Sequence, residues 1–282
     1  MEFIHIYIRS LVILLGAVSV PLFADTQLSN SPESTPFTNA KDNNLYHIAT
    51  VFRSRIKKID SLTKMKNHIY DKAQHLDFVS TLTFINNVLT RLPKYQDLFE
   101  SAGDEQGLDW RLLAATAYQE SLWNPEAVSP TGVRGLMMLT KVTARELEIV
   151  DRLDPQQSVA GGARYLSLLE SRLPERITSP DRMWMALASY NIGSGHLEDA
   201  RILTQKFGAN PDKWQDVRKH LPLLAHSKWH RQAKRGYARG GEPVQYVRNI
   251  RSYFEILVWL TSKQAKVMLV ENEVNDLLLS AL

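Results

Sequence analysis

Hydrophobic and polar residues recur at helical spacing over most of this 282-residue chain, from Leu45 onward. Residues 109–120 read DWRLLAATAYQE, and Leu113, Ala117 and Glu120 have the i, i+4, i+7 spacing that stacks side chains on one face of a helix. The chain has no internal repeat and no convincing run of alternating strand residues. The pattern therefore predicts an all-α fold.

Start and stop signals place further helices. The periodicity predicts helices over residues 78–92 and 95–102, separated by Pro93. Residues 154–157, DPQQ, offer a capping side chain, a proline at the first helical position and a reciprocal glutamine, so they should open a helix that runs to about residue 172. Within it, Gly161-Gly162-Ala163 should let another backbone come close.

A further helix should begin at Ser179-Pro180 and run through Tyr190. It is apolar on most sides, so we expect it in the middle of the domain. The glycines of residues 191–195, NIGSG, permit a left-handed backbone and a sharp exit. Tyr190 and Asn191 should therefore lie at the exposed mouth of a buried helix, where binding sites form in helical bundles.

The two ends of the chain differ from its middle. Residues 1–24 resemble an export signal cleaved near Ala24, because their apolar run is too short for a comfortable membrane span; an uncleaved anchor is the alternative. Residues 25–44 are polar and predict a flexible linker, and residues 45–75 predict a basic helical extension. Residues 263–282 predict an amphipathic helix with an acidic face, expected to pack on its own domain or on a protein partner.

Composition narrows the classes of function. The chain has no cysteine, which excludes disulfides, thiolate metal sites, cysteine nucleophiles and a lipid-modified cysteine. Its net charge of +4 suits contact with an acidic polymer but is too weak to indicate nucleic acid, and no nucleic-acid-binding motif is present.

Glu120 is the first candidate for chemistry. A carboxyl group on the apolar stripe faces protein, and burial raises its pKa, as a proton donor near neutral pH requires. The alternative is a solvated helix end or a pair with an arginine. Pro125 should end this helix just past Glu120, and Pro130 and Gly132 should fold the following loop back.

The histidines suggest a different site. His226 and His230 lie four residues apart, with His220 upstream, a spacing that could place two imidazoles on one helix face for zinc. No glutamate follows the first histidine as a metalloprotease would require. Trp229 and Lys228 favour an ordinary basic surface, so we expect no metal.

Four short stretches occur in the order known from one family: Glu120-Ser121, Gly135-Leu136-Met137, Ser189-Tyr190-Asn191 and Tyr246-Val247-Arg248-Asn249-Ile250, the last with a tyrosine that opens a helix. They resemble the lytic transglycosylases of the goose-lysozyme-like superfamily.

The longer stretches 109–140, 161–166 and 236–240 resemble the F-type membrane-bound lytic murein transglycosylases in particular. Three departures from the family pattern stand out. Ser189 replaces the usual alanine, and Met138-Leu139 stands where many relatives have glutamine, although the F-type proteins share it. A third is the lack of room for the solute-binding-like domain that precedes the catalytic domain in the F-type subgroup.

The resemblance implies a lysozyme-like catalytic domain over residues 76–262, acting on the glycan strands of peptidoglycan without metal or cofactor. Glu120 would protonate the leaving oxygen and then act as base, so that a 1,6-anhydro sugar forms. By the same resemblance, Ser129 would hold the acetamido group, Tyr190, Asn191 and Tyr246 would orient the sugar or Glu120, and Met137 would line the cleft. An exported, periplasmic protein follows, with association with the inner or outer membrane left open.

The residues alone leave other interpretations open. Tyr190 on an apolar helix can be simply core, Met137 a gap filler and Ser129 a turn residue. A muramidase that uses water is the enzymatic alternative, with Glu126 or Glu242 as second acid, although we expect both on the solvated surface. A catalytically inactive peptidoglycan-binding or scaffold module is the alternative from another class.

Overall fold

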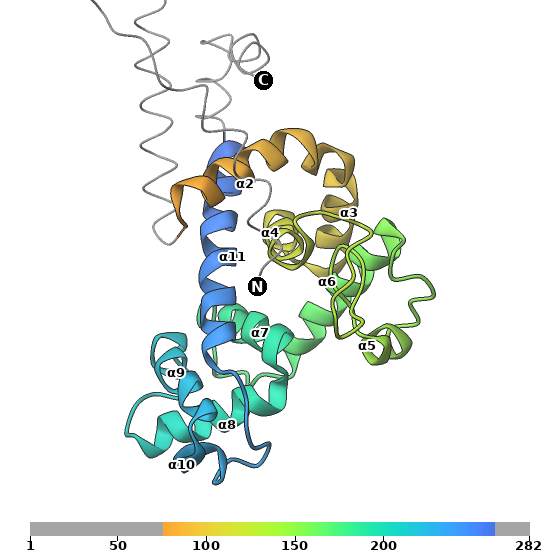
Figure 1. Cartoon of the computed structure of the whole chain (residues 1–282). Helices are drawn as coiled ribbons and strands as arrows, with labels where there is room; N and C mark the ends of the chain where they lie inside the picture. Colours follow the sequence, from red (N-terminus) through yellow and green to blue (C-terminus); the bar gives the residue numbers. More distant parts are fainter. Residues whose placement is uncertain (1–75, 263–282) are drawn as a thin grey trace, which may run out of the picture. The chain divides into compact units, whose positions relative to one another are not determined.

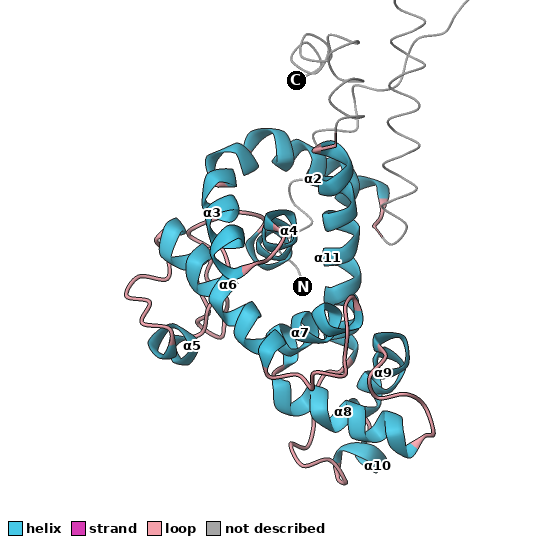
Figure 2. Ribbon diagram, turned by 180° about the vertical axis from the view of Figure 1, so that it is seen from behind, coloured by secondary structure: helices cyan, strands magenta, loops and turns pink. Residues whose placement is uncertain are grey.

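The structure, a computed structural model, describes residues 76–262; the expected signal, linker, N-terminal extension and C-terminal amphipathic helix lie outside the described residues. Within the described range the chain is helical, in line with the predicted all-α fold (Figures 1 and 2). The elements are α2 (Phe78–Thr90), η1 (Leu92–Lys94), α3 (Gln96–Gln106), α4 (Trp110–Ser121), α5 (Lys141–Glu146), α6 (Pro155–Ser171), α7 (Asp181–Ile192), α8 (Ser194–Lys206), α9 (Trp214–His220), η2 (Leu221–Ala225), α10 (Ser227–His230) and α11 (Gly241–Leu260). No helix of residues 76–262 combines the length and apolar character that a membrane span needs.

Helix α4 lies among its neighbours, with α3, α6 and α11 packed around it (Figure 1). Its residues Leu113, Ala114 and Ala117 are fully buried. The long helix α11 packs along both α4 and α7. An acidic side chain at the end of α4 is therefore close to the surfaces of two other helices.

An aromatic cluster fixes α2 and α11 against α4. The Tyr118 ring of α4 makes edge contacts with Phe84 of α2, Trp123 and Tyr253 of α11, with ring centroids 4.6, 4.7 and 4.8 Å apart. Such pairs add about 0.5–1.5 kcal/mol each beyond the burial of their area. The Tyr118 hydroxyl accepts a hydrogen bond from Asn87 at 3.2 Å, so its polar end is satisfied in the core.

Aspartates cap the N-termini of α4 and α6. Asp109 accepts from the Arg111 N–H at 2.9 Å, and the predicted cap of α6 is confirmed in part, because Asp154 accepts from the Gln157 N–H at 2.8 Å. The reciprocal half of the second cap was wrong. The Gln157 side chain instead accepts from the backbone N–H groups of Val150 and Asp151, both at 3.0 Å, and so ties the preceding loop to α6.

The glycines of α6 also differ from the prediction, because side chains rather than a second backbone come close. A Cβ on Gly162 would lie 2.5–2.6 Å from the side-chain atoms of Met137, and one on Gly161 would lie 2.9 Å from Leu139 and Ile149. The loop after α4 therefore packs onto α6 where α6 has no side chains.

The end of α4 is set by a feature other than Pro125. The helix stops at Ser121, and Leu122 and Trp123 both have left-handed backbones, with φ of 53° and 55°. This turn sends the Trp123 ring back onto α4, where its indole N–H donates to the Ala114 carbonyl at 2.9 Å. Burial of a tryptophan therefore terminates the helix at Ser121, four residues before the proline.

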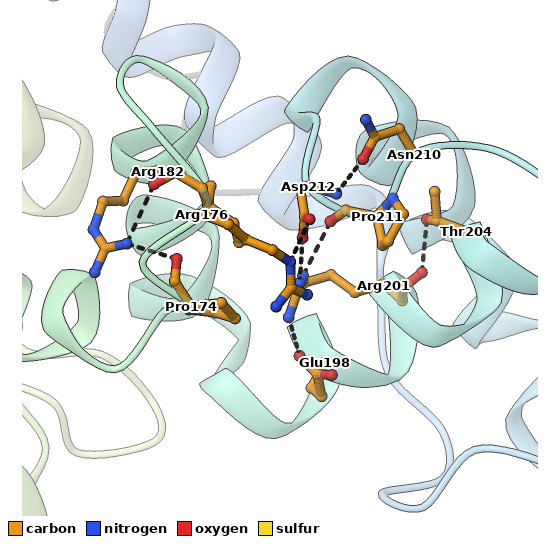
Figure 3. Close-up of polar contacts among 11 residues, drawn as sticks. Pro174, Arg176, Arg182, Glu198, Arg201, Thr204, Asn210, Pro211 and Asp212 are labelled. Carbon is orange, nitrogen blue, oxygen red and sulfur yellow. Dashed lines mark hydrogen bonds and ion pairs between the residues drawn. The ribbon is translucent and has the colours of Figure 1, made fainter.

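A charged cluster closes the loop between α8 and α9 (Figure 3). Arg201 of α8 is only 4% exposed, and its guanidinium group has three hydrogen-bond acceptors in the cluster. It donates to Asp212 at 2.6 Å, to Glu198 at 2.5 Å and to the Pro211 carbonyl at 3.0 Å. Arg176 contacts the other oxygen of Asp212 at 2.6 Å, so one carboxylate joins two arginines.

Candidate active site

Glu120 lies in the last turn of α4 and is partly exposed. Its Oε1 accepts a hydrogen bond from the Tyr246 hydroxyl at 2.6 Å. Burial raises the pKa of Glu120 from 4.5 to about 7, although the hydrogen bond from Tyr246 works in the opposite direction. The expected rise in pKa is thus present, and within residues 76–262 no basic side chain forms an ion pair with this carboxyl.

Tyr246 is buried in α11, where it faces α4. It does not open a helix, as its motif had suggested, because α11 already begins at Gly241. Burial raises the pKa of Tyr246 well above 10, and the nearby Glu120 charge raises it further. The phenol therefore stays protonated and serves as a hydrogen-bond donor.

Tyr190, in the last turn of α7, stands near the same carboxyl. Burial raises the pKa of its phenol well above 10, and the charge of Glu120 adds to the effect. Its hydroxyl donates to the Met137 carbonyl at 2.7 Å, and its ring makes an edge contact with Tyr165 of α6 at 5.2 Å between centroids. Three helices thus bring one acid and two phenols together.

The prediction that the Met137 side chain lines a cleft is wrong. That side chain has no solvent exposure and packs against Gly162. The backbone of Met137 matters instead: its N–H donates to the Oγ of Ser158 at 3.1 Å, and its carbonyl accepts from Tyr190. Met137 therefore positions Tyr190 through a main-chain atom.

Ser129 lies in the loop between α4 and α5, partly exposed, in a tight turn. Its carbonyl accepts from the Gly132 N–H at 2.9 Å, and Gly132 has a φ of 81°, so the chain folds back here as predicted. The Ser129 Oγ lies 2.9 Å from Thr131 Oγ1 and accepts from the Val133 N–H at 3.3 Å. No hydrogen bond joins Ser129 to Glu120, so the structure places Ser129 in its turn and not in the acid-phenol group.

Comparison with known proteins agrees with this geometry. Residues 97–212 match the family described as Transglycosylase SLT domain. The chain is 50% identical over 229 residues to the membrane-bound lytic murein transglycosylase F of Marinobacter nauticus, covering 81% of this chain and 46% of that protein. It is 48% identical over 246 residues to the protein of the same name from Alcanivorax borkumensis, covering 87% and 53%.

The chain spans about half the length of these curated relatives. Among solved structures it is similar to the 70 kDa soluble lytic transglycosylase of Escherichia coli, with 19% identity and a TM-score of 0.44 over 73% of this chain and 31% of that chain.

Asn191 is exposed, next to Tyr190 and just before the end of α7. Gly193, with a φ of 88°, separates α7 from α8, as the predicted glycine exit required. Ser189, the departure from the family pattern, is buried with an Oγ that has no hydrogen-bond partner. The expectation of an exposed polar tip on a buried helix is therefore met by Asn191.

The alternative acids and ligands lie elsewhere. Glu126 and Glu242 are both exposed, and Glu242 pairs with Arg239 at 3.3 Å. The His220 ring contacts the Asp216 carbonyl at 3.0 Å. Within the described range, no group of three or more histidine, aspartate or glutamate side chains could hold a metal ion.

Three supporting side chains were missed from the sequence. Arg152 donates to the carbonyls of Gly132 and Leu139, at 3.0 and 2.8 Å, and so braces the loop that carries Ser129. Ser158 and Tyr165 hold the Met137 backbone and the Tyr190 ring. Ser121, by contrast, was visible in the sequence as part of the Glu-Ser motif. Its hydroxyl donates to the Leu136 carbonyl at 2.9 Å and so binds the same loop to α4.

Proposed function

We propose that the protein is a lytic transglycosylase that cleaves the β-1,4 bond between N-acetylmuramic acid and N-acetylglucosamine in peptidoglycan. The observation that carries this proposal is the pKa of about 7 at Glu120, a carboxyl with a phenol donor and no cationic partner. The names of the relatives, lytic murein transglycosylases, support the substrate class.

Glu120 acts twice in the proposed reaction. It first gives its proton to the glycosidic oxygen as the bond from the muramic C1 breaks, and the acetamido oxygen of the same sugar stabilises the positive charge at C1. The Glu120 carboxylate then takes the proton of the 6-hydroxyl, whose oxygen bonds to C1. The product is a 1,6-anhydro sugar, no water is consumed, and Glu120 ends protonated.

A single acid with a pKa near 7 suits both steps. An acid of much lower pKa would be deprotonated before the first step, and one of much higher pKa would be a poor donor. The Tyr246 hydrogen bond stabilises the carboxylate that exists between the steps. Attack by the sugar's own hydroxyl gains effective molarity over water, so no second carboxylate is needed.

The other expected contacts complete the proposed site. Asn191 is placed to hydrogen-bond the sugar from the exposed end of α7, and Tyr190 forms a wall beside Glu120. Ser129 would reach the acetamido group from the loop after α4, exchanging its hydrogen bonds within the turn for one to the substrate.

We also place the protein in the periplasm, exported by residues 1–24. The relatives are named as membrane-bound, which supports action close to a membrane. Wall glycan is the only substrate that the proposal requires, and neither metal nor cofactor takes part in it.

The test is mass spectrometry of the soluble products released from purified peptidoglycan. The proposal expects products one water lighter than those of a hydrolase, released by the wild type and by the control Glu126→Gln but not by Glu120→Gln. Products of the hydrolysed mass would indicate a muramidase. Binding of wall without any product from the wild type would indicate a scaffold module.

A further inference from the structure

One segment of the chain is strongly basic. Residues 217–241 contain seven lysines and arginines and no acidic residue, which leaves 27 basic against 30 acidic residues elsewhere. The positive net charge of the chain therefore comes from this segment, which forms the end of α9, η2, α10 and the loop before α11.

The cations of this segment divide into paired and unpaired ones. Lys219 pairs with Asp216 at 3.1 Å, and Arg239 pairs with Glu242. The other five are exposed and form no ion pair within residues 76–262: Arg218 in α9 and, further along the chain, the four residues Lys228, Arg231, Lys234 and Arg235. We call residues 228–239, which hold these four, the basic loop.

A buried carboxylate fixes the basic loop. Asp199 of α8 is only 4% exposed, and its two oxygens accept from the backbone N–H groups of Lys234 and Arg235 at 3.1 and 2.8 Å. The N–H of Ala238 donates to the Leu224 carbonyl at 3.2 Å. Since a buried charge needs such hydrogen bonds, they hold the backbone of the loop in one place at residues 234, 235 and 238.

Arg235 extends from this loop over the first turn of α8. A Cβ on Gly195 would lie 2.7 Å from the Nε of Arg235 and 3.0 Å from its Cγ, so the absence of a side chain at Gly195 makes room for the arginine. Gly195 follows Asn191 by four residues. Arg235 therefore lies close to the end of α7 that carries Tyr190 and Asn191, where α8 follows α7 (Figure 1).

We propose that the basic loop, through Arg235 above all, binds carboxylates of the peptides that branch from the glycan strand. This inference rests on the proposed function. Carboxylates of the wall lie mainly on those peptides, and an arginine side chain with no ion pair can bind a carboxylate with two parallel hydrogen bonds. An arginine whose backbone is held by Asp199, and whose side chain lies over Gly195 near the proposed sugar contacts, is close enough to meet a peptide of the same strand.

The experiment compares two substrates: wall that retains its peptides, and glycan strands from which an amidase has removed them. Arg235→Gln should raise KM about fivefold on the first and leave kcat unchanged, because an exposed ion pair contributes about 1 kcal/mol. On peptide-free strands it should match the wild type. Arg235→Lys should recover part of the loss, and the matched control Lys219→Gln, whose cation is already paired, should change neither substrate.

A second measurement is independent of turnover. Co-sedimentation with both substrates, done in the Glu120→Gln background, should show weaker binding of Arg235→Gln to peptide-bearing wall only. If the wild type forms no product but this difference in binding persists, the proposed function fails and the peptide contact stands.

Other results would overturn the inference. Equal losses on both substrates would mean that Arg235 serves the glycan or the fold, and no loss on either would mean that the basic loop binds no peptide. Loss of binding to vesicles of anionic phospholipid, with wall binding intact, would identify the loop as a membrane contact instead.

Discussion

Two carboxyl groups of this protein show opposite behaviour. Glu120 has a neutral phenol as its partner, and burial raises its pKa to about 7. Partial burial works in the same direction at Asp212, but hydrogen bonds from Arg176 and Arg201 outweigh it and hold the pKa of Asp212 below 3.8. The hydrogen-bonding partner of each carboxyl group, and not its burial alone, decides whether the group keeps a proton that it can donate.

The arginine cluster also shows the kind of partner, a cationic side chain, that Glu120 does not have among the described residues. Arg201 is buried, and two acids and a carbonyl satisfy it, which is how a structural charge is accommodated (Figure 3). A cation at the same distance from Glu120 would lower its pKa and leave a carboxylate that cannot act as an acid at neutral pH.

The sharpest contrast comes from neutralising Glu120 alone. Glu120→Gln should lower the turnover of peptidoglycan by at least about 10³-fold, since general acid-base catalysis contributes 10²–10⁴-fold and this residue acts in both steps. Its melting temperature near pH 7 should stay at or above that of the wild type, because no ion pair is lost. Turnover and calorimetry on the same preparation check both, and retained activity would contradict the role of Glu120.

Removing the buried Arg201 should affect the stability of the protein. Arg201→Met should lower the free energy of unfolding by about 3 kcal/mol, because the acids beside it lose their buried partner. Urea unfolding measures the change. The matched control is Arg176→Met: its side chain is 64% exposed, so a loss of under about 1 kcal/mol is expected. Equal losses from both variants would argue against a structural role specific to Arg201.

The two acids should give stability profiles of opposite sign. For Glu120 the folded state holds a proton that the unfolded chain has released, so its contribution falls as pH rises from about 4.5 to about 7, by an order of 3 kcal/mol. Glu120→Gln should remove this slope, as read from unfolding at pH 5 and pH 8. For Asp212, with its lowered pKa, the contribution is present above pH 3.8 and is lost as pH falls further.

The smallest effect concerns the phenol. Tyr246→Phe removes a hydrogen bond that lowers the pKa of Glu120, so the alkaline limb of the kcat/KM profile should move to higher pH. The rate at the optimum should fall about tenfold, because the intermediate carboxylate loses a donor worth about 1.5 kcal/mol. A lower rate with an unmoved limb would mean that Tyr246 contacts only the sugar.

Local chemistry explains what the sequence predicted well. The apolar stripe of α4 and Glu120 at its end depend on residues within one helix. The end of the same helix was misassigned to Pro125, because the burial of Trp123 against α4 is a tertiary contact. Met137 was misjudged for a similar reason: its side chain fits a gap on α6 that appears only when the loop packs there.

The contacts that define the site join distant parts of the chain. Tyr246 reaches Glu120 across 126 positions, and Tyr190 reaches Met137 across 53. The family resemblance identified both tyrosines, but not the atoms that they contact. Arg152 had no signal, since an arginine that braces two carbonyls of a loop looks like any surface cation in a sequence.

Both backbone polar groups of Met137 are hydrogen-bonded: the N–H donates to Ser158, and the carbonyl accepts from Tyr190. If a ligand pulled the Tyr190 hydroxyl away, that carbonyl would lose its partner, at a cost of about 1–3 kcal/mol. In the proposed reaction, Tyr190 would thus be a rigid surface that the sugar must fit. Adaptation to differently modified walls would have to arise at Asn191 or Ser129, whose side chains can turn without unfastening the framework.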